Sequence, residues 1–155
     1  MYQEEALLER AVIGLEKRYG RALLRSPVFD FTFTDYYTEE MGLGLKKVFV
    51  GFEKTISPDE LAQVKLFANS LEEKYAFIDK EAKKRTLNID PGYVGEGKVV
   101  LASTKNRSQR IYLGRGVFAE VTLLFKGGVY LPLPWTYPDY KTPLACSFFQ
   151  SFKNL

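Results

Sequence analysis

The chain has 155 residues, of which 46% are hydrophobic and 26% charged, and its formal net charge is +3. This composition is typical of a folded globular protein and excludes disordered and collagen-like chains. The absence of histidine excludes Ser-His-Asp and Cys-His catalysis, and the single cysteine, Cys146, excludes an internal disulfide.

The length and the start of the chain predict one cytoplasmic domain over residues 1–155. No run approaches the roughly 18 apolar residues that a membrane span needs, so no membrane partner is expected. The first ten residues, MYQEEALLER, are acidic where a signal peptide is basic and then apolar.

The first predicted elements are a helix and two strands. Apolar residues recur at spacings of four and three over residues 4–19, and Gly20 follows as a helix stop. Phenylalanines alternate with Asp or Thr over residues 28–34, which predicts a strand with one apolar face. Residues 45–52 predict a second strand that pairs with it.

A second helix has the clearest start signal in the chain. Ser57-Pro58-Asp59-Glu60 has the pattern of a capping box with proline at the first helical position. The apolar stripe that follows extends to Tyr75. Lys65, Asn69 and Glu72 form a polar stripe beside it by the same helical spacing.

The second half of the chain predicts short strands and one helix. A turn at Pro91-Gly92 and a hairpin at Gly127-Gly128 separate them, and Pro132 and Pro134 restrict the last strand to a sheet edge. The strands are expected at residues 85–90, 99–104, 110–113, 117–125 and 129–133, and the helix runs from Thr142-Pro143 to about Phe152.

This order predicts an α+β fold, with a mostly antiparallel sheet and two main helices packed on it. It matches a ferredoxin-like βαββαβ half that lacks its first strand, followed by a C-terminal β-meander and a short C-terminal helix. Either the fold differs from this pattern, or the start codon used here lies downstream of the true one; we favour the second explanation.

Seven stretches carry a resemblance to a known family: FTFTDYYTEEMG at 31–42, KLFANSLE at 65–72, NIDPGY at 88–93, VLASTK at 100–105, RIYL at 110–113, AEVTL at 119–123 and WTYPDY at 135–140. On these, the whole chain resembles the prokaryotic domain of unknown function numbered 4416. The resemblance implies a short strand before the first helix, and commonly a histidine where this chain has Gln109. It implies no reaction, although some members are labelled GTP-binding.

The GTP label can be tested on the segment GYVGEGK, Gly92 to Lys98, which fits the first seven positions of a P-loop. A P-loop also needs Ser or Thr at the next position and a helix that begins there. Here Val99 follows, and Val99-Val100-Leu101 predicts a strand. We therefore interpret the segment as a glycine-rich turn between two strands.

A cationic loop is the first candidate site. Lys105, Arg107, Arg110 and Arg115 fall within eleven positions, with Tyr112 among them. Arginine presents a planar fork that matches phosphate, and lysine adds a point charge. The alternative is a solvated turn with no ligand.

Carboxylates are the second candidate. Glu120 lies in a mostly apolar strand, where it is either a structural partner of an arginine such as Arg110, or a general base or magnesium ligand. Asp90, beside Asn88, could act with it, and magnesium suits one or two carboxylates plus substrate phosphates. Further oxygen donors are Asp35, Glu39, Glu40 and Asp139.

These candidates lead to two hypotheses. The first is binding of a nucleotide or other phosphorylated small ligand, with phosphoryl or nucleotidyl chemistry on Asp90 and Glu120. Its expected ligand-binding residues are Asn88, Lys105, Arg107, Arg110, Tyr112, Trp135, Tyr137 and Asp139. The second is a non-catalytic module for RNA or a protein partner, in which exposed aromatics such as Trp135 and Tyr137 act with the same cations. An exposed sheet edge would also permit self-association.

Overall fold

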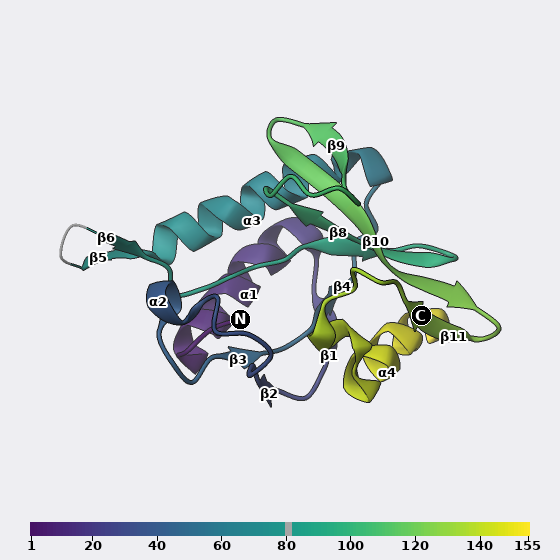
Figure 1. Ribbon diagram of the computed structural model, residues 1–155, viewed down its shortest axis with the longest axis horizontal. Helices are drawn as coiled ribbons and strands as arrows, with labels where there is room; N and C mark the ends of the chain where they lie inside the picture. Colours follow the sequence, from purple (N-terminus) through teal and green to yellow (C-terminus); the bar gives the residue numbers. More distant parts are fainter. Residues whose placement is uncertain (80–81) are drawn as a thin grey trace. The chain divides into compact units, whose positions relative to one another are not determined.

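The computed structural model describes residues 1–79 and 82–155, and it confirms an α+β protein built on antiparallel strands (Figure 1). The chain divides into two compact units. Unit 1 comprises Met1–Thr55 and Ala68–Ile89, and unit 2 comprises Ile56–Phe67 and Asp90–Leu155. The helix α3 (Leu61–Tyr75) contributes its first turns to unit 2 and its last turns to unit 1.

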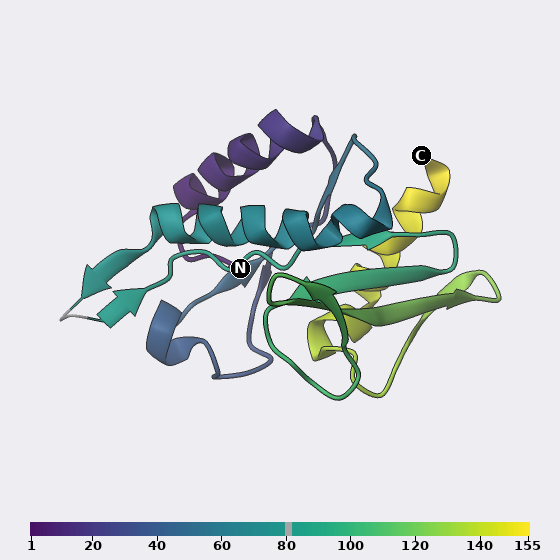
Figure 2. The same ribbon diagram turned by 90° about the horizontal axis from the view of Figure 1, so that it is seen from above.

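Within residues 1–55, 68–79 and 82–89, unit 1 shows two further helices and six short strands. These are α1 (Glu5–Tyr19), β1 (Ala22–Arg25), β2 (Phe29–Asp30), α2 (Thr38–Met41), β3 (Lys46–Lys47), β4 (Val50–Phe52), β5 (Phe77–Asp79) and β6 (Ala82–Lys84). The first predicted helix is confirmed as α1, and it ends at Gly20, whose φ of 76° is in the left-handed region. Figure 2 shows α1 beside α3, and a Cβ at Gly14 would lie 3.2 Å from Leu71 Cδ2.

Tyr2 lies at the centre of unit 1. Its side chain is buried against Leu8, Val12 and Leu87. Its backbone forms antiparallel bridges to both Lys46 and Leu87. Because β3 also pairs with β2, the antiparallel order across unit 1 is Leu87, Tyr2, Lys46 and then Asp30.

Two strand predictions in unit 1 were too long. The strand over 28–34 is only β2, and residues 45–52 form β3 and β4 with a break between them. The strand over 85–90 is absent apart from the bridge at Leu87. Backbone pairing there is limited to the first residues of the chain, where the Asn88 N–H donates to Met1 O at 2.9 Å, and the Ile89 N–H donates instead to Glu72 Oε1 at 2.6 Å. The strand β1, which pairs with β4, was not predicted, because its residues do not alternate in polarity.

Unit 2 is built around one five-stranded sheet. Its strands are β7 (Gly92–Val94), β8 (Lys98–Ser103), β9 (Ile111–Gly114), β10 (Val117–Lys126) and β11 (Val129–Pro132). The order is β11-β10-β8-β7, and β9 pairs with the first residues of β10. The helical segments are η1 (Pro58–Glu60), the start of α3, η2 (Pro138–Lys141), α4 (Pro143–Ser151) and η3 (Phe152–Asn154).

Both sides of this sheet are covered by helices from unit 2. Leu61 and Ala62 of α3 pack with Val100, Ala102 and Val117. The C-terminal helix α4 packs on β11, where the rings of Tyr130 and Phe149 lie 6.1 Å apart. In the long strand β10, four of the ten residues are buried, four are partly buried and two are exposed.

Several local signals in unit 2 are confirmed. Ser57 and Glu60 form the predicted capping box. Gly127 and Gly128 both have positive φ in a tight hairpin, and β11 lies at the sheet edge. The hydroxyl of Thr142 accepts from the Ala145 N–H at the start of α4.

The glycine-rich segment 92–98 joins two paired strands. Lys98 begins β8, so no helix follows the segment, and Gly95 N–H donates to Lys98 O at 2.8 Å across the turn. The turn predicted at Pro91-Gly92 was wrong, because Gly92 lies in β7 opposite Leu101. A Cβ at Gly92 would collide with the carbonyl oxygen of Val100. The first glycine is therefore required for the close approach of two strands.

Replacing Gly92 with alanine is expected to lower the free energy of unfolding by about 1–3 kcal/mol, because the backbone of Val100 must move. Gly97→Ala is the matched control, since nothing lies within 4 Å of its Cβ position and its φ is not positive; we expect a change within about 0.5 kcal/mol. Urea denaturation of both variants measures this, and equal effects would contradict it.

Candidate functional site

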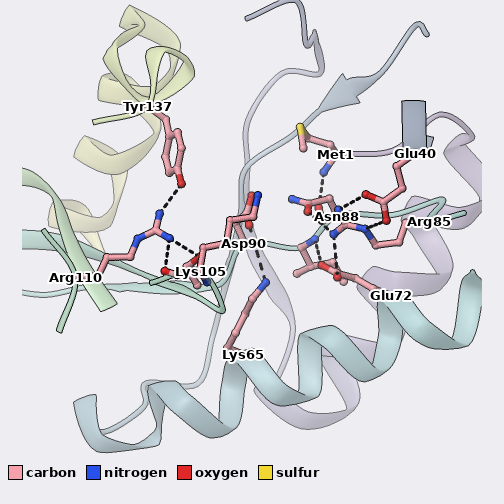
Figure 3. A network of polar contacts seen from close by, with 12 residues as sticks. Met1, Glu40, Lys65, Glu72, Arg85, Asn88, Asp90, Lys105, Arg110 and Tyr137 are labelled. Carbon is pink, nitrogen blue, oxygen red and sulfur yellow. Dashed lines mark hydrogen bonds and ion pairs between the residues drawn. The ribbon is translucent and has the colours of Figure 1, made fainter. Parts of the chain in front are cut away.

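Arg110 organises the polar interior of unit 2. It directly precedes β9, and only 3% of its side chain is exposed. Its Nε donates to Glu120 Oε2 at 2.8 Å, and its Nη2 donates to the hydroxyl of Tyr137 at 2.6 Å. Its Nη1 donates to Ser103 Oγ and to the carbonyl of Lys105, each at 2.8 Å (Figure 3).

Glu120 is the anionic partner of this arginine. It projects from β10 with 2% of its side chain exposed, and its Oε2 also accepts from Gln109 Nε2 at 3.0 Å. The structure thus shows the ion pair with Arg110 that was one of the two interpretations of this carboxylate. Its other oxygen, Oε1, is buried and has no donor within the part of the chain that the structure describes.

Burial and mutual contacts shift the pKa values of Arg110 and Tyr137. Burial is the largest single influence and works against the charged form of Arg110, but the hydrogen bonds and charges of Glu120 and Tyr137 together outweigh it, so the pKa of Arg110 is raised. Burial also raises the pKa of Tyr137, with the Arg110 charge acting in the opposite direction. The hydroxyl of Tyr137 therefore keeps its proton at neutral pH.

The loop between β8 and β9 is braced by the same guanidinium. Arg110 holds the carbonyl of Lys105, and its own backbone N–H donates to Arg107 O at 3.0 Å. The Lys105 N–H donates in turn to Ser103 Oγ at 3.2 Å. Both Lys105 and Arg107 are exposed to solvent. Four predicted cations thus separate into one buried residue and three exposed ones, the third being Arg115.

Asp90 lies in the same electrostatic neighbourhood. Its Oδ1 is 4.0 Å from Nζ of the buried Lys65, while 34% of the Asp90 side chain remains exposed. Burial raises the pKa of Tyr140 well above its usual value, and the charges of Asp90, Asp139 and Glu120 add to this effect. The charges of Asp90 and Glu120 therefore act on the same two tyrosines of unit 2, Tyr137 and Tyr140.

The predicted aromatic residues differ in their surroundings. Trp135 is exposed, although its indole N–H donates to Val121 O at 2.8 Å. The exposed ring of Tyr112 lies 5.2 Å from that of Phe118. Tyr137 is also exposed while its hydroxyl binds Arg110. Unit 2 thus presents three partly exposed rings whose positions are fixed by internal contacts.

A second polar network accounts for Asn88, which belongs to unit 1. Arg85 makes a bidentate ion pair with Glu40, at 2.6 and 2.7 Å, and donates to Asn88 Oδ1 at 2.9 Å (Figure 3). Its Nη1 also lies 3.4 Å from Oε2 of Glu72. Hydrogen bonding to Glu40 raises the pKa of Arg85, which therefore stays charged. These contacts are typical of a structural network.

The sequence did not predict that Lys65 and Glu72 are buried members of these networks. Both were recognised in sequence as members of a polar stripe on α3, and the structure shows that each is buried and faces an opposite charge. A polar stripe directly beside an apolar one was the available signal. Asp35 and Glu39, considered as oxygen donors, are exposed.

No three Asp, Glu or Cys side chains among residues 1–79 and 82–155 lie close enough together to hold a metal ion. A magnesium ion in unit 2 would thus need phosphate oxygens from a ligand beside one or two carboxylates. None of the helices in the described ranges has the length and hydropathy that a membrane span requires.

A family model described as a domain of unknown function (DUF4416) matches residues 1–155, the whole chain. No curated protein and no solved structure matches the chain. The comparisons therefore add a family but no reaction, and the geometry of the two polar networks remains the basis for function.

Proposed function

The chain belongs to the DUF4416 family, and we propose that unit 2 binds a nucleotide or another small phosphorylated molecule on the loop at residues 103–110. One observation carries this proposal. A buried arginine, Arg110, fixes the backbone of the loop, while Lys105 and Arg107 stay exposed on it.

Bracing matters because an ordered loop loses less conformational entropy when a ligand binds. When a cationic loop is only solvated, the ligand has to order it on binding. In unit 2, hydrogen bonds from the interior already order the backbone of this loop. Lysine and arginine together suit a phosphate group, through a point charge and a planar fork.

The rings of Tyr137 and Trp135 supply a surface for the rest of the ligand. The Tyr137 hydroxyl and the Lys105 carbonyl both bind the guanidinium of Arg110, so this ring lies beside the braced loop. A base or sugar could pack on these rings while the phosphates contact Lys105 and Arg107. The exposed Tyr112 follows this loop on β9, whereas Asp139 is only 3% exposed and is not part of the proposed site.

Among the carboxylates, Asp90 is better placed for chemistry on a bound phosphate than Glu120. A third of its side chain is exposed beside Lys65, whereas Glu120 is buried against Arg110. We propose Asp90 as the acid–base or magnesium-binding residue in any phosphoryl or nucleotidyl transfer, and Glu120 as the residue that positions Arg110.

Substituting both Lys105 and Arg107 with alanine is expected to weaken nucleotide binding about 10- to 100-fold, because two charge-assisted contacts to phosphate are lost. Thermal-shift titrations with ATP, GTP and pyrophosphate, each with and without magnesium, measure this, since a bound ligand raises the melting temperature. The double variant Lys98→Ala/Lys126→Ala removes the same charge from other exposed positions and should bind normally. If no probe stabilises the protein, the proposal is wrong.

The alternative function, a non-catalytic module for RNA or a protein partner, is supported by the exposed aromatic and aliphatic residues of β9. RNA binding would weaken steeply with salt, in proportion to the number of phosphates contacted. The salt dependence of the affinity therefore separates the two functions.

We also infer that unit 1 is a ferredoxin-like half. The antiparallel order Leu87, Tyr2, Lys46 and Asp30 supports it, because the two central positions then belong to segments that precede the two helices α1 and α3. A cytoplasmic location stays a prediction from the sequence.

A further inference from the structure

The strand β9 is an exposed sheet edge with an apolar sequence. Ile111 is 74% exposed and Tyr112 60% exposed, and Leu113 is exposed as well. Across the described ranges, β9 pairs with β10 and with no other strand. Its outer edge thus presents backbone N–H and C=O groups flanked by apolar side chains.

The edge strand β11 carries features that discourage pairing, which β9 lacks. The edge strand β11 contains Pro132, and its Tyr130 packs on α4. Proline and charged residues within a strand are the usual protection of an exposed edge. The sequence of β9, Ile-Tyr-Leu-Gly, contains neither. An edge without this protection is suited to pairing with a further strand.

Positive charge surrounds β9. Residues 103–117 contain four cations and no Asp or Glu. Arg110 is neutralised in the interior by Glu120, so the exposed charges are Lys105 and Arg107 before the strand and Arg115 after it. Arg115 sits in the turn into β10 with a φ of 55°. The surface therefore has an apolar strip with a cationic rim.

From this combination we propose that β9 binds an extended, acidic segment of a partner protein as an added β-strand. Backbone hydrogen bonds would supply affinity, alternate apolar side chains of the partner would pack on Ile111 and Leu113, and its carboxylates would face the cationic rim.

The charge distribution disfavours the other occupants. A second copy pairing through β9 would bring two sets of three cations together, which is repulsive. Single-stranded RNA binds chiefly by stacking bases on aromatic rings, and two of the three exposed residues of β9 are aliphatic. Tyr112 itself packs on Phe118.

The proposal can be tested with a capped peptide of about eight residues in which Glu and Val alternate, long enough to span β9. Titrated into isotopically labelled protein, it should shift the backbone amide resonances of Ile111, Tyr112 and Leu113 and leave those of β11 unchanged. A peptide with Lys in place of Glu, and one with alternate amides N-methylated, should each bind at least about tenfold more weakly.

Protein variants locate the contact. Ile111→Asp and Arg115→Glu should each weaken the Glu–Val peptide about tenfold, whereas Val129→Asp on the exposed surface of β11 should not. The neutral variant Ile111→Ser removes an apolar contact and keeps Lys105 and Arg107, so it should weaken the peptide and leave nucleotide binding nearly unchanged, which distinguishes contacts to β9 from contacts to the cations that the two sites share.

Three results would overturn the proposal. The first is the absence of any amide shift in β9 with the Glu–Val peptide. The second is a shift with oligouridylate instead of the peptide. The third is sedimentation showing that the protein self-associates and that Ile111→Asp abolishes this, which would assign the edge to a second copy.

Discussion

Replacing Arg110 with methionine is expected to lower the free energy of unfolding by about 3–5 kcal/mol, because Glu120 would keep a buried charge without its partner. Ser103, the Lys105 carbonyl and Tyr137 would lose their donor as well. Urea denaturation followed by the fluorescence of Trp135 measures this, since Trp135 is the single tryptophan of the chain and lies in unit 2.

A second substitution tests the cause. In the Arg110→Met background, Glu120→Leu removes the unpaired carboxylate, and we expect it to restore a large part of the lost stability. Arg107→Ala, in the exposed part of the same loop, should change the free energy of unfolding by less than about 0.5 kcal/mol. If Arg110→Met and Arg107→Ala had similar effects, the buried pair would not stabilise unit 2.

Replacing Arg85 with methionine is expected to destabilise unit 1 by about 2–4 kcal/mol, because it leaves the largely buried Glu72 and the half-buried Glu40 without their cation. The expected loss is smaller than for Arg110, since a quarter of the Arg85 side chain is exposed and water can solvate the remaining carboxylates. Urea denaturation followed by circular dichroism measures the global change.

Hydrogen exchange of the Ile89 amide gives a local measurement of the same substitution. That amide donates to Glu72, whose other oxygen faces Arg85, so its protection should fall when the arginine is removed. The matched control is Lys83→Ala, because Lys83 pairs with Glu73 at the surface and both side chains are exposed. We expect that control to cost less than about 1 kcal/mol; a larger cost for Lys83→Ala would contradict the assignment.

The two arginine networks also differ in what they mean for ligand binding. Arg110 holds a loop with exposed cations, so Arg110→Met should weaken nucleotide binding together with stability. Arg85 forms its hydrogen bonds with carboxylates and with Asn88, all within unit 1. Arg85→Met should therefore change stability while nucleotide affinity, measured on the folded fraction, stays the same.

The sequence alone was sufficient wherever structure depends on neighbours along the chain. The start of the second helix follows from Ser57 and Glu60, and the end of the first from Gly20. The hairpin follows from Gly127 and Gly128. Each of these signals depends on a hydrogen bond or a backbone dihedral within a few residues, so it can be recognised in the local sequence. The failure of the P-loop pattern could be predicted for the same reason, from Val99.

Only the tertiary structure decided which charged residues are buried. Arg107 and Arg110 are close in sequence and chemically identical. Arg110 forms an ion pair with Glu120, ten residues away across a strand pair, and Arg107 does not. Likewise Lys65 and Glu72 form one polar stripe in sequence, and each is buried because an opposite charge from a distant segment faces it. A buried charge is stable only with a partner, and chain folding determines which partners meet. Composition and spacing therefore predict that a charged site exists, while the three-dimensional pairing decides which of its members remain available to a ligand.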